Sequence, residues 1–246
     1  PPSGVSSVTT LIIDRIRGRA VALHETGPNL AFVLAPVVVS LALSSMGWRG
    51  ILGAASGLGL VLVVSFRRHS VAGQFHGQRP DLHNLKAIVS QVRFWVLMVM
   101  FVLAASGTMG VYAILPTYLV QNQGMHLDAV NTALSVSRAV AIGAVFLTGH
   151  LVDRFGAGRL IAAVLSFTGV LTILVGLLSG TPLLVAVLLQ PIVITSFFPA
   201  ALVAITELGP PEIRNVAVSI IVPAANIIAS GLYPSILGWL TEQGAA

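Results

Sequence analysis

One arginine stands inside an apolar segment that is long enough to cross a lipid bilayer. Arg138 lies in the run from Leu127 to Thr148, 15 residues before Asp153, or about 22 Å along a helix rising 1.5 Å per residue. A cation near the bilayer centre costs about 2.5–3.5 kcal/mol on insertion scales and usually faces a cavity or a partner. Because guanidinium matches carboxylate geometry, we expect Arg138 to bind an anionic group of a substrate. The alternative is a structural ion pair, with Glu25 or with an acid outside this sequence.

Further polar residues are candidates for lining the same cavity. Asn131 and Ser135 share the helical face of Arg138. The run 216–240 carries polar side chains at steps of three and four, which predicts one polar stripe along a helix; the alternative is hydrogen bonding between helices. The predicted substrate-binding residues are Arg138, Asn131, Ser135, Tyr112, Asn226, Ser230 and Asn29.

A second candidate role is proton coupling, and it falls on His24 and Glu25. They sit just inside one end of an apolar run, where a carboxylate could take up and release a proton. The alternative is an interfacial pair that bonds to the neighbouring basic loop. The six histidines show no ligand spacing, cysteine is absent and there is no phosphate-binding loop, so we expect no metal and no cofactor.

Composition predicts the element that positions these residues, a bundle of membrane-spanning helices. The chain of 246 residues is 56% hydrophobic and 9% charged, with a mean hydropathy of +0.94. A soluble domain is about 25% charged. Without water the backbone must bond to itself, so the apolar runs are predicted to be helices and the fold all-α. The predicted spans are 20–45, 51–66, 94–120, 127–148, 160–178, 182–205 and 216–240, with 1–13 as the tail of another.

Lysine and arginine are distributed unequally between alternate loops. Eleven of the thirteen fall in the loops at 14–19, 67–93, 149–159 and 207–215. The opposite loops hold only Arg49, and Arg138 lies within a span. The positive-inside rule therefore predicts that the four basic loops are cytoplasmic and that the protein is a multi-pass protein of the cell membrane.

A short charged loop between two spans is a candidate gate. It joins the runs 127–148 and 160–178 and leaves room only for a reversal of the chain. An acid there is stabilised beside helix N-termini by their dipoles, so Asp153 and Arg154 are predicted to hold the cytoplasmic side shut in one state. The predicted gating residues are Gly149, Asp153, Arg154, Gly156 and Arg159.

The same loop carries a resemblance to a known family. Its pattern of Gly149, Asp153, Arg154, Gly156 and Arg159 is similar to a loop motif of the major facilitator superfamily, although Ala157 and Gly158 replace basic residues. A second likeness is an internal repeat at an offset of 197 residues, which relates Ile16, Arg17, Ala20, Val21 and Asn29 to Ile213, Arg214, Ala217, Val218 and Asn226. Parallel six-helix repeats joined by a cytoplasmic linker are the plan of this superfamily.

The resemblance implies a fold and a function. The chain would run from the end of helix 4 to helix 11, with 1–66 ending the first half, 67–92 as linker and 93–246 in the second half. It implies a non-enzymatic, monomeric secondary transporter that works by alternating access, without nucleic acid. Its substrate is predicted to be a small organic or inorganic anion, with a proton or an exchanged anion as a further partner. The alternatives are efflux of hydrophobic compounds and a membrane sensor or enzyme.

Overall fold

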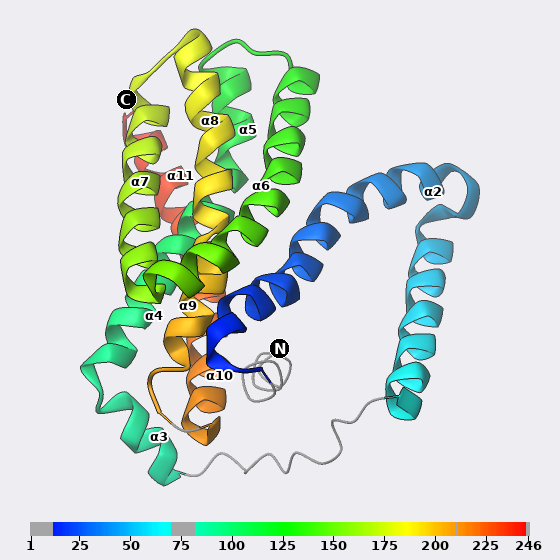
Figure 1. Ribbon diagram of the computed structural model, residues 1–246. Helices are drawn as coiled ribbons and strands as arrows, with labels where there is room; N and C mark the ends of the chain where they lie inside the picture. The colour runs from blue at the N-terminus through cyan, green and yellow to red at the C-terminus, as the bar shows by residue number, and fades with distance from the viewer. Residues whose placement is uncertain (1–11, 70–81, 210, 245–246) are drawn as a thin grey trace. The chain divides into compact units, whose positions relative to one another are not determined.

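The computed structural model describes residues 12–69, 82–209 and 211–244, and these are helical almost throughout, with no strand among them (Figure 1). Contacts divide the chain into two compact units. One consists of Pro1–Gly27 together with Pro80–Ala246, and the other is Pro28–Arg79. The all-α fold predicted from composition is therefore confirmed, and each unit is described below by itself.

The smaller unit contains most of the long helix α2 (Arg17–His69). The helix is interrupted at Gly47, whose φ of 63° and ψ of 171° lie outside the helical region. A positive φ is readily adopted only by glycine, which explains why the reversal occurs at this residue. The break expected between the predicted spans 20–45 and 51–66 is thus found, at Gly47. The segment Ser45–His69 is long and apolar enough to cross a membrane, and the predicted span 20–45 is helical as part of α2.

The larger unit is a bundle of helices that run side by side (Figure 1). In chain order they are α3 (Leu82–Val89), α4 (Val92–Ala105), η3 (Ser106–Gly110), α5 (Val111–Gln121), α6 (Leu127–Phe155), α7 (Ala157–Leu177), α8 (Gly180–Thr195), α9 (Phe197–Ile205), α10 (Pro211–Ile227), η4 (Ile228–Leu232) and α11 (Tyr233–Gly244). Several of these follow one another without a break, so the described part of the whole chain has six segments long and apolar enough to cross a membrane. The protein is a multi-pass membrane protein.

Two apolar clusters hold this bundle together. In the first, Phe101 of α4 meets Phe197 of α9 edge to face, with ring centroids 5.1 Å apart. In the second, Leu119 of α5, Val130 of α6 and Val187 of α8 are fully buried. Lipid tails are as apolar as these side chains, so close packing, rather than removal of apolar surface from water, stabilises such contacts.

The bundle differs from the prediction in three places. Residues 149–155, predicted as loop, form the last two turns of α6, and the chain reverses at Gly156 alone, where φ is 83°. A short helix, α3, lies in the predicted linker 67–92, whose residues 70–81 are outside the described part, as is most of 1–13. The spans 94–120 and 216–240 each contain a π-helical turn, η3 and η4, which hydropathy cannot register.

Candidate functional site

The first candidate site is built around Arg138 on α6. Its guanidinium carbon lies 4.6 Å from the centroid of the Tyr112 ring on α5. A cation over an aromatic face is stabilised by about 0.5–2 kcal/mol, more where water is excluded. Arg138 itself is half-buried, whereas Tyr112 is buried, with 9% of its surface exposed. The structure therefore brings two of the predicted substrate-binding residues into direct contact.

Sequence reasoning missed the residue that supports this pair. Ser137 is 1% exposed, and its hydroxyl donates a hydrogen bond of 2.6 Å to the carbonyl of Leu188 on α8. The Tyr112 hydroxyl lies next to Ser137 but forms no well-aligned hydrogen bond within the described residues. Ser137 thus ties α6, the helix of Arg138, to α8. Only its position beside Arg138 could have drawn attention to Ser137, because a lone serine in an apolar run carries no signal.

The other predicted lining residues lie at separate positions on several helices. Asn131 and Ser135 are exposed on α6, towards its N-terminus from Arg138, and Asn226 is half-buried on α10. The hydroxyl of Ser230 in η4 donates to the Met109 sulfur in η3 at 3.4 Å, so it bonds between helices. Asn29 belongs to the smaller unit and is half-buried there. A role in lining a cavity with Arg138 stays a prediction for all five.

A second polar cluster escaped the sequence reasoning. Gln190 of α8, 2% exposed, donates its side-chain N–H to the carbonyl of Gly107 in η3 at 3.1 Å. A π-helical turn shifts backbone bonding to i→i+5, and such turns frequently occur at functional sites. The amide of Gln190 therefore fastens α8 to the irregular turn that immediately precedes the Tyr112 helix.

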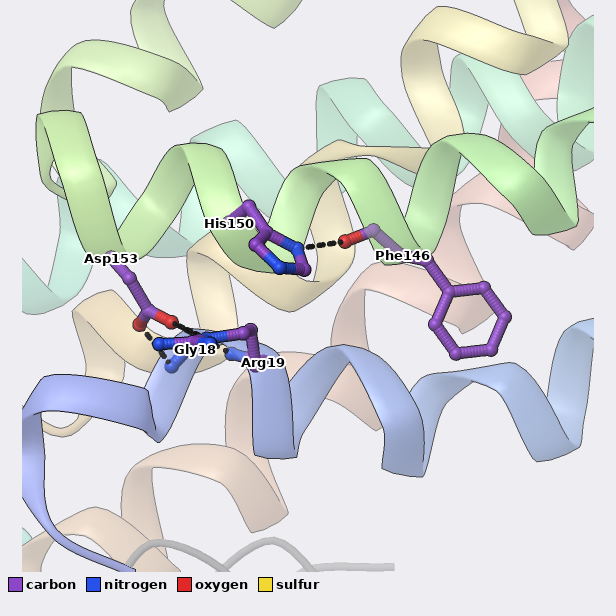
Figure 2. Close-up of polar contacts among 5 residues, drawn as sticks. All are labelled: Gly18, Arg19, Phe146, His150 and Asp153. Atoms are coloured by element: carbon purple, nitrogen blue, oxygen red, sulfur yellow. Dashed lines mark hydrogen bonds and ion pairs between the residues drawn. The ribbon is translucent and has the colours of Figure 1, made fainter.

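The charged junction lies at the end of α6, where Asp153 meets the start of α2 within the larger unit (Figure 2). Asp153 Oδ1 accepts from the backbone N–H of Gly18 at 2.8 Å. Its Oδ2 accepts from Arg19 Nε at 3.0 Å and from the Arg19 backbone N–H at 3.4 Å. The first N–H groups of a helix have no partner within it, and the helix dipole there favours negative charge. Asp153 of α6 thus caps α2.

Two glycines allow this close approach. A Cβ atom on Gly18 would lie 2.6 Å from Asp153 Oδ1 and 2.8 Å from the Gly149 carbonyl oxygen. A Cβ atom on Gly149 would lie 2.8 Å from the Cα of Arg19. Both distances to backbone atoms are shorter than real Cβ contacts, so any side chain would push the helices apart. Gly149 and Asp153, two of the predicted gating residues, therefore act at one contact.

The remaining gating candidates lie elsewhere. Arg154 is exposed, with its guanidinium 5.2 Å from the Phe155 ring centroid, and Arg159 is exposed on the first turn of α7. His150, one turn before Arg154, bonds to the Phe146 carbonyl of its own helix (Figure 2). His24 and Glu25, the candidates for proton coupling, are half-buried in the second turn of α2 or just beyond it.

The fold is that of a polytopic helical membrane protein. Comparison with known proteins identifies its family. The family model described as Major Facilitator Superfamily matches residues 1–234, nearly the whole chain, so the chain belongs to the major facilitator superfamily. No curated protein sequence matches the chain.

The structure is similar to a crystal structure of a Major Facilitator Superfamily transporter, FucP, in the outward conformation. The TM-score is 0.71 at 14% sequence identity, with 98% of this chain and 66% of that chain covered. At that identity the likeness concerns the fold alone. The chain spans just under two thirds of the length of FucP.

Proposed function

We propose that this chain is part of a secondary transporter that moves a small anion across the membrane by alternating access. Membership of the superfamily supports transport, and the observation that supports an anion is Arg138, held against Tyr112 within a membrane span. Alternating access means that two helical halves rock about a site near the bilayer midplane. The proposed halves end and begin in 1–66 and 93–246, joined by the linker 67–92.

The contact with Tyr112 stabilises the positive charge of Arg138 in a way that is compatible with anion binding. A guanidinium has five N–H donors, all of which point outward in its own plane. An aromatic ring against its face stabilises the charge without using those donors. In-plane pairs of N–H groups match the two oxygens of a carboxylate, or two oxygens of an inorganic oxyanion. Arg138 is proposed to bind the substrate through this edge, with Asn131 and Ser135 of the same helical face beside it.

The junction of Asp153 with Gly18 and Arg19 is proposed to act as the cytoplasmic gate. It joins the start of α2, which belongs to the proposed first half, to the end of α6 in the proposed second half. Inward opening would separate these helices and break the three hydrogen bonds to Asp153. The basic loops at 14–19, 67–93, 149–159 and 207–215 support a cytoplasmic location for this end and insertion in the cell membrane.

The test of the substrate class uses the full-length protein in detergent, compared with its Arg138→Gln variant. A ligand that binds only the folded state raises the unfolding temperature as its site fills. We expect one or more small anions to stabilise the native protein and not Arg138→Gln, and the same anions to be taken up by vesicles containing the native protein. If hydrophobic compounds stabilise both proteins equally and no anion has any effect, the anion proposal is wrong and efflux is favoured.

A further inference from the structure

The inference concerns the elbow between α3 and α4, which neither the Arg138 site nor the gate involves. In the bundle of Figure 1, α3 leaves the end of α4 at an angle, and the two helices meet at Ser90 and Gln91. We propose that this elbow lies in the headgroup layer of the membrane and binds anionic phospholipid.

One side of α3 is fixed to the protein. Ile88 is 1% exposed and belongs to the cluster that includes residues of α4 and α10. The helix packs on both of these elements. It therefore keeps a set orientation relative to the spans, and its other side is presented away from the bundle.

Exposed apolar residues occur on both helices of the elbow. Along α4 they recur at helical spacing, at Val92, Trp95, Val96, Val99 and Leu103. On α3, Leu85 and Val89 lie one turn apart, flank the buried Ile88 and are each 36% exposed. Apolar surface of this kind that reaches past the end of a span favours a helix lying in the membrane interface.

The carbonyls at the end of α3 are bonded within the protein. The last four carbonyls of a helix have no partner within it and in water are usually hydrated. Here the Lys86 carbonyl accepts from the Ser90 N–H at 3.2 Å, and the Ile88 carbonyl accepts from the Gln91 N–H at 2.9 Å. The Ala87 carbonyl accepts from the Ser90 hydroxyl at 3.1 Å and from the Gln91 amide at 3.2 Å.

The fourth carbonyl, that of Val89, accepts a hydrogen bond from a side chain of α4. The indole N–H of Trp95 donates to the Val89 carbonyl at 2.8 Å across six residues. This bond uses the only donor of a tryptophan that is 52% exposed. In the apolar part of a membrane each unsatisfied backbone group costs several kcal/mol, so carbonyls that bond within the protein suit a turn at the edge of that region. The last four carbonyls of α3 are all bonded in this way.

Two basic side chains at the elbow favour an anionic lipid over a neutral one. Lys86 on α3 and Arg93 on α4 are both exposed and flank the elbow, and neither forms an ion pair with a residue that the structure describes. Long basic side chains near span ends reach the phosphate layer while their stems stay in apolar surroundings. A zwitterionic headgroup carries its own cation, whereas the net negative charge of an anionic headgroup complements this pair.

The first experiment measures lipid affinity of the full-length protein in neutral detergent. Short-chain phosphatidylglycerol is titrated against the unfolding temperature, with short-chain phosphatidylcholine and glycerol phosphate as separate arms. We expect only phosphatidylglycerol to stabilise the protein. Each basic residue near an anionic surface contributes about fivefold in affinity, so Lys86→Gln with Arg93→Gln should weaken binding about 25-fold.

Arg49→Gln is the matched control, because Arg49 is also exposed and stacks on an exposed tryptophan, Trp48, at 4.5 Å. It removes the same charge and should leave the affinity unchanged. The proposal is wrong if phosphatidylcholine or glycerol phosphate stabilises as strongly as phosphatidylglycerol. It is equally wrong if Arg49→Gln weakens binding as much as the exchange of Lys86 and Arg93.

A second experiment locates the elbow directly and does not depend on charge. The fluorescence lost in Trp95→Phe, measured in vesicles, isolates the signal of Trp95. We expect that signal to be quenched by phosphatidylcholine brominated near the top of its acyl chains and protected from aqueous iodide. Quenching by iodide without quenching by brominated lipid would place the elbow in water and overturn the proposal.

Discussion

The two charged sites of the larger unit are constructed in opposite ways. At the junction, the carboxylate of Asp153 accepts three hydrogen bonds, is 11% exposed, and lies against two glycines that leave no space. In the span, Arg138 is half-buried, with its guanidinium carbon 4.6 Å from the centroid of the Tyr112 ring. Three hydrogen bonds fix the position of the Asp153 carboxylate, whereas a cation–π contact imposes no hydrogen-bond direction. The first construction suits a contact that is made or broken as a whole, and the second suits an exchangeable ligand.

The largest expected effect separates the two sites by function. Arg138→Gln should lower anion uptake by about 100-fold or more, because two charge-assisted hydrogen bonds of about 1.5–3 kcal/mol each are lost. Arg138→Lys should restore part of the uptake, since it keeps the charge without the fork of donors. Uptake of labelled anion into vesicles measures both. An Arg138→Gln protein with normal uptake would remove the binding role from this side chain.

The next effect concerns the packing of the junction. Gly18→Ala should destabilise the folded protein by about 1–3 kcal/mol, the usual cost of overpacking, because the new methyl group meets backbone atoms. Gly158→Ala is the control, since a Cβ atom there meets nothing within 4 Å. Thermal unfolding of both variants measures the difference. Equal unfolding temperatures for the two would show that the junction is not closely packed in the membrane.

The charge of the junction should contribute less than its packing. Asp153→Asn should cost about 1–2 kcal/mol, a value reduced by the 45% exposure of the Arg19 side chain in the ion pair. Arg154→Gln in the same motif should change stability by less than about 0.5 kcal/mol, because Arg154 is exposed. Chemical denaturation of the two variants tests this order. The reverse order would transfer the gating role from Asp153 to Arg154.

The smallest expected effects distinguish the role of the Tyr112 ring from the role of its hydroxyl. Tyr112→Leu should weaken anion affinity by about 0.5–2 kcal/mol, because the cation–π contact is lost. Tyr112→Phe should leave the affinity nearly unchanged, since the hydroxyl makes no well-aligned hydrogen bond in the described residues. Thermal-shift titration with an anion that stabilises the native protein measures both. A large loss in Tyr112→Phe would assign the binding role to the hydroxyl instead.

The sequence was sufficient for the spans and for the residue types at both sites. Apolar length located the helices. It did not predict that the second reversal falls at Gly156 alone, because residues 149–155, predicted as loop, are helical. It was not sufficient for the partners. The Gly18–Asp153 bond joins residues 135 positions apart, and a backbone N–H donor has no sequence signature. Likewise, the roles of Ser137 and Gln190 depend on which helices are neighbours, which hydropathy does not specify.

The π-helical turn η3 changes the direction in which the side chains that follow it point around the helix axis. An α-helix advances about 100° per residue, so the extra residue of a π turn rotates every side chain that follows by about that angle. Tyr112 comes two residues after Gly110, the last residue of η3. Deleting one residue within η3 would leave composition and hydropathy almost unchanged, yet would turn the Tyr112 ring away from Arg138. The extra residue of the η3 turn therefore sets which face of the following helix the guanidinium meets.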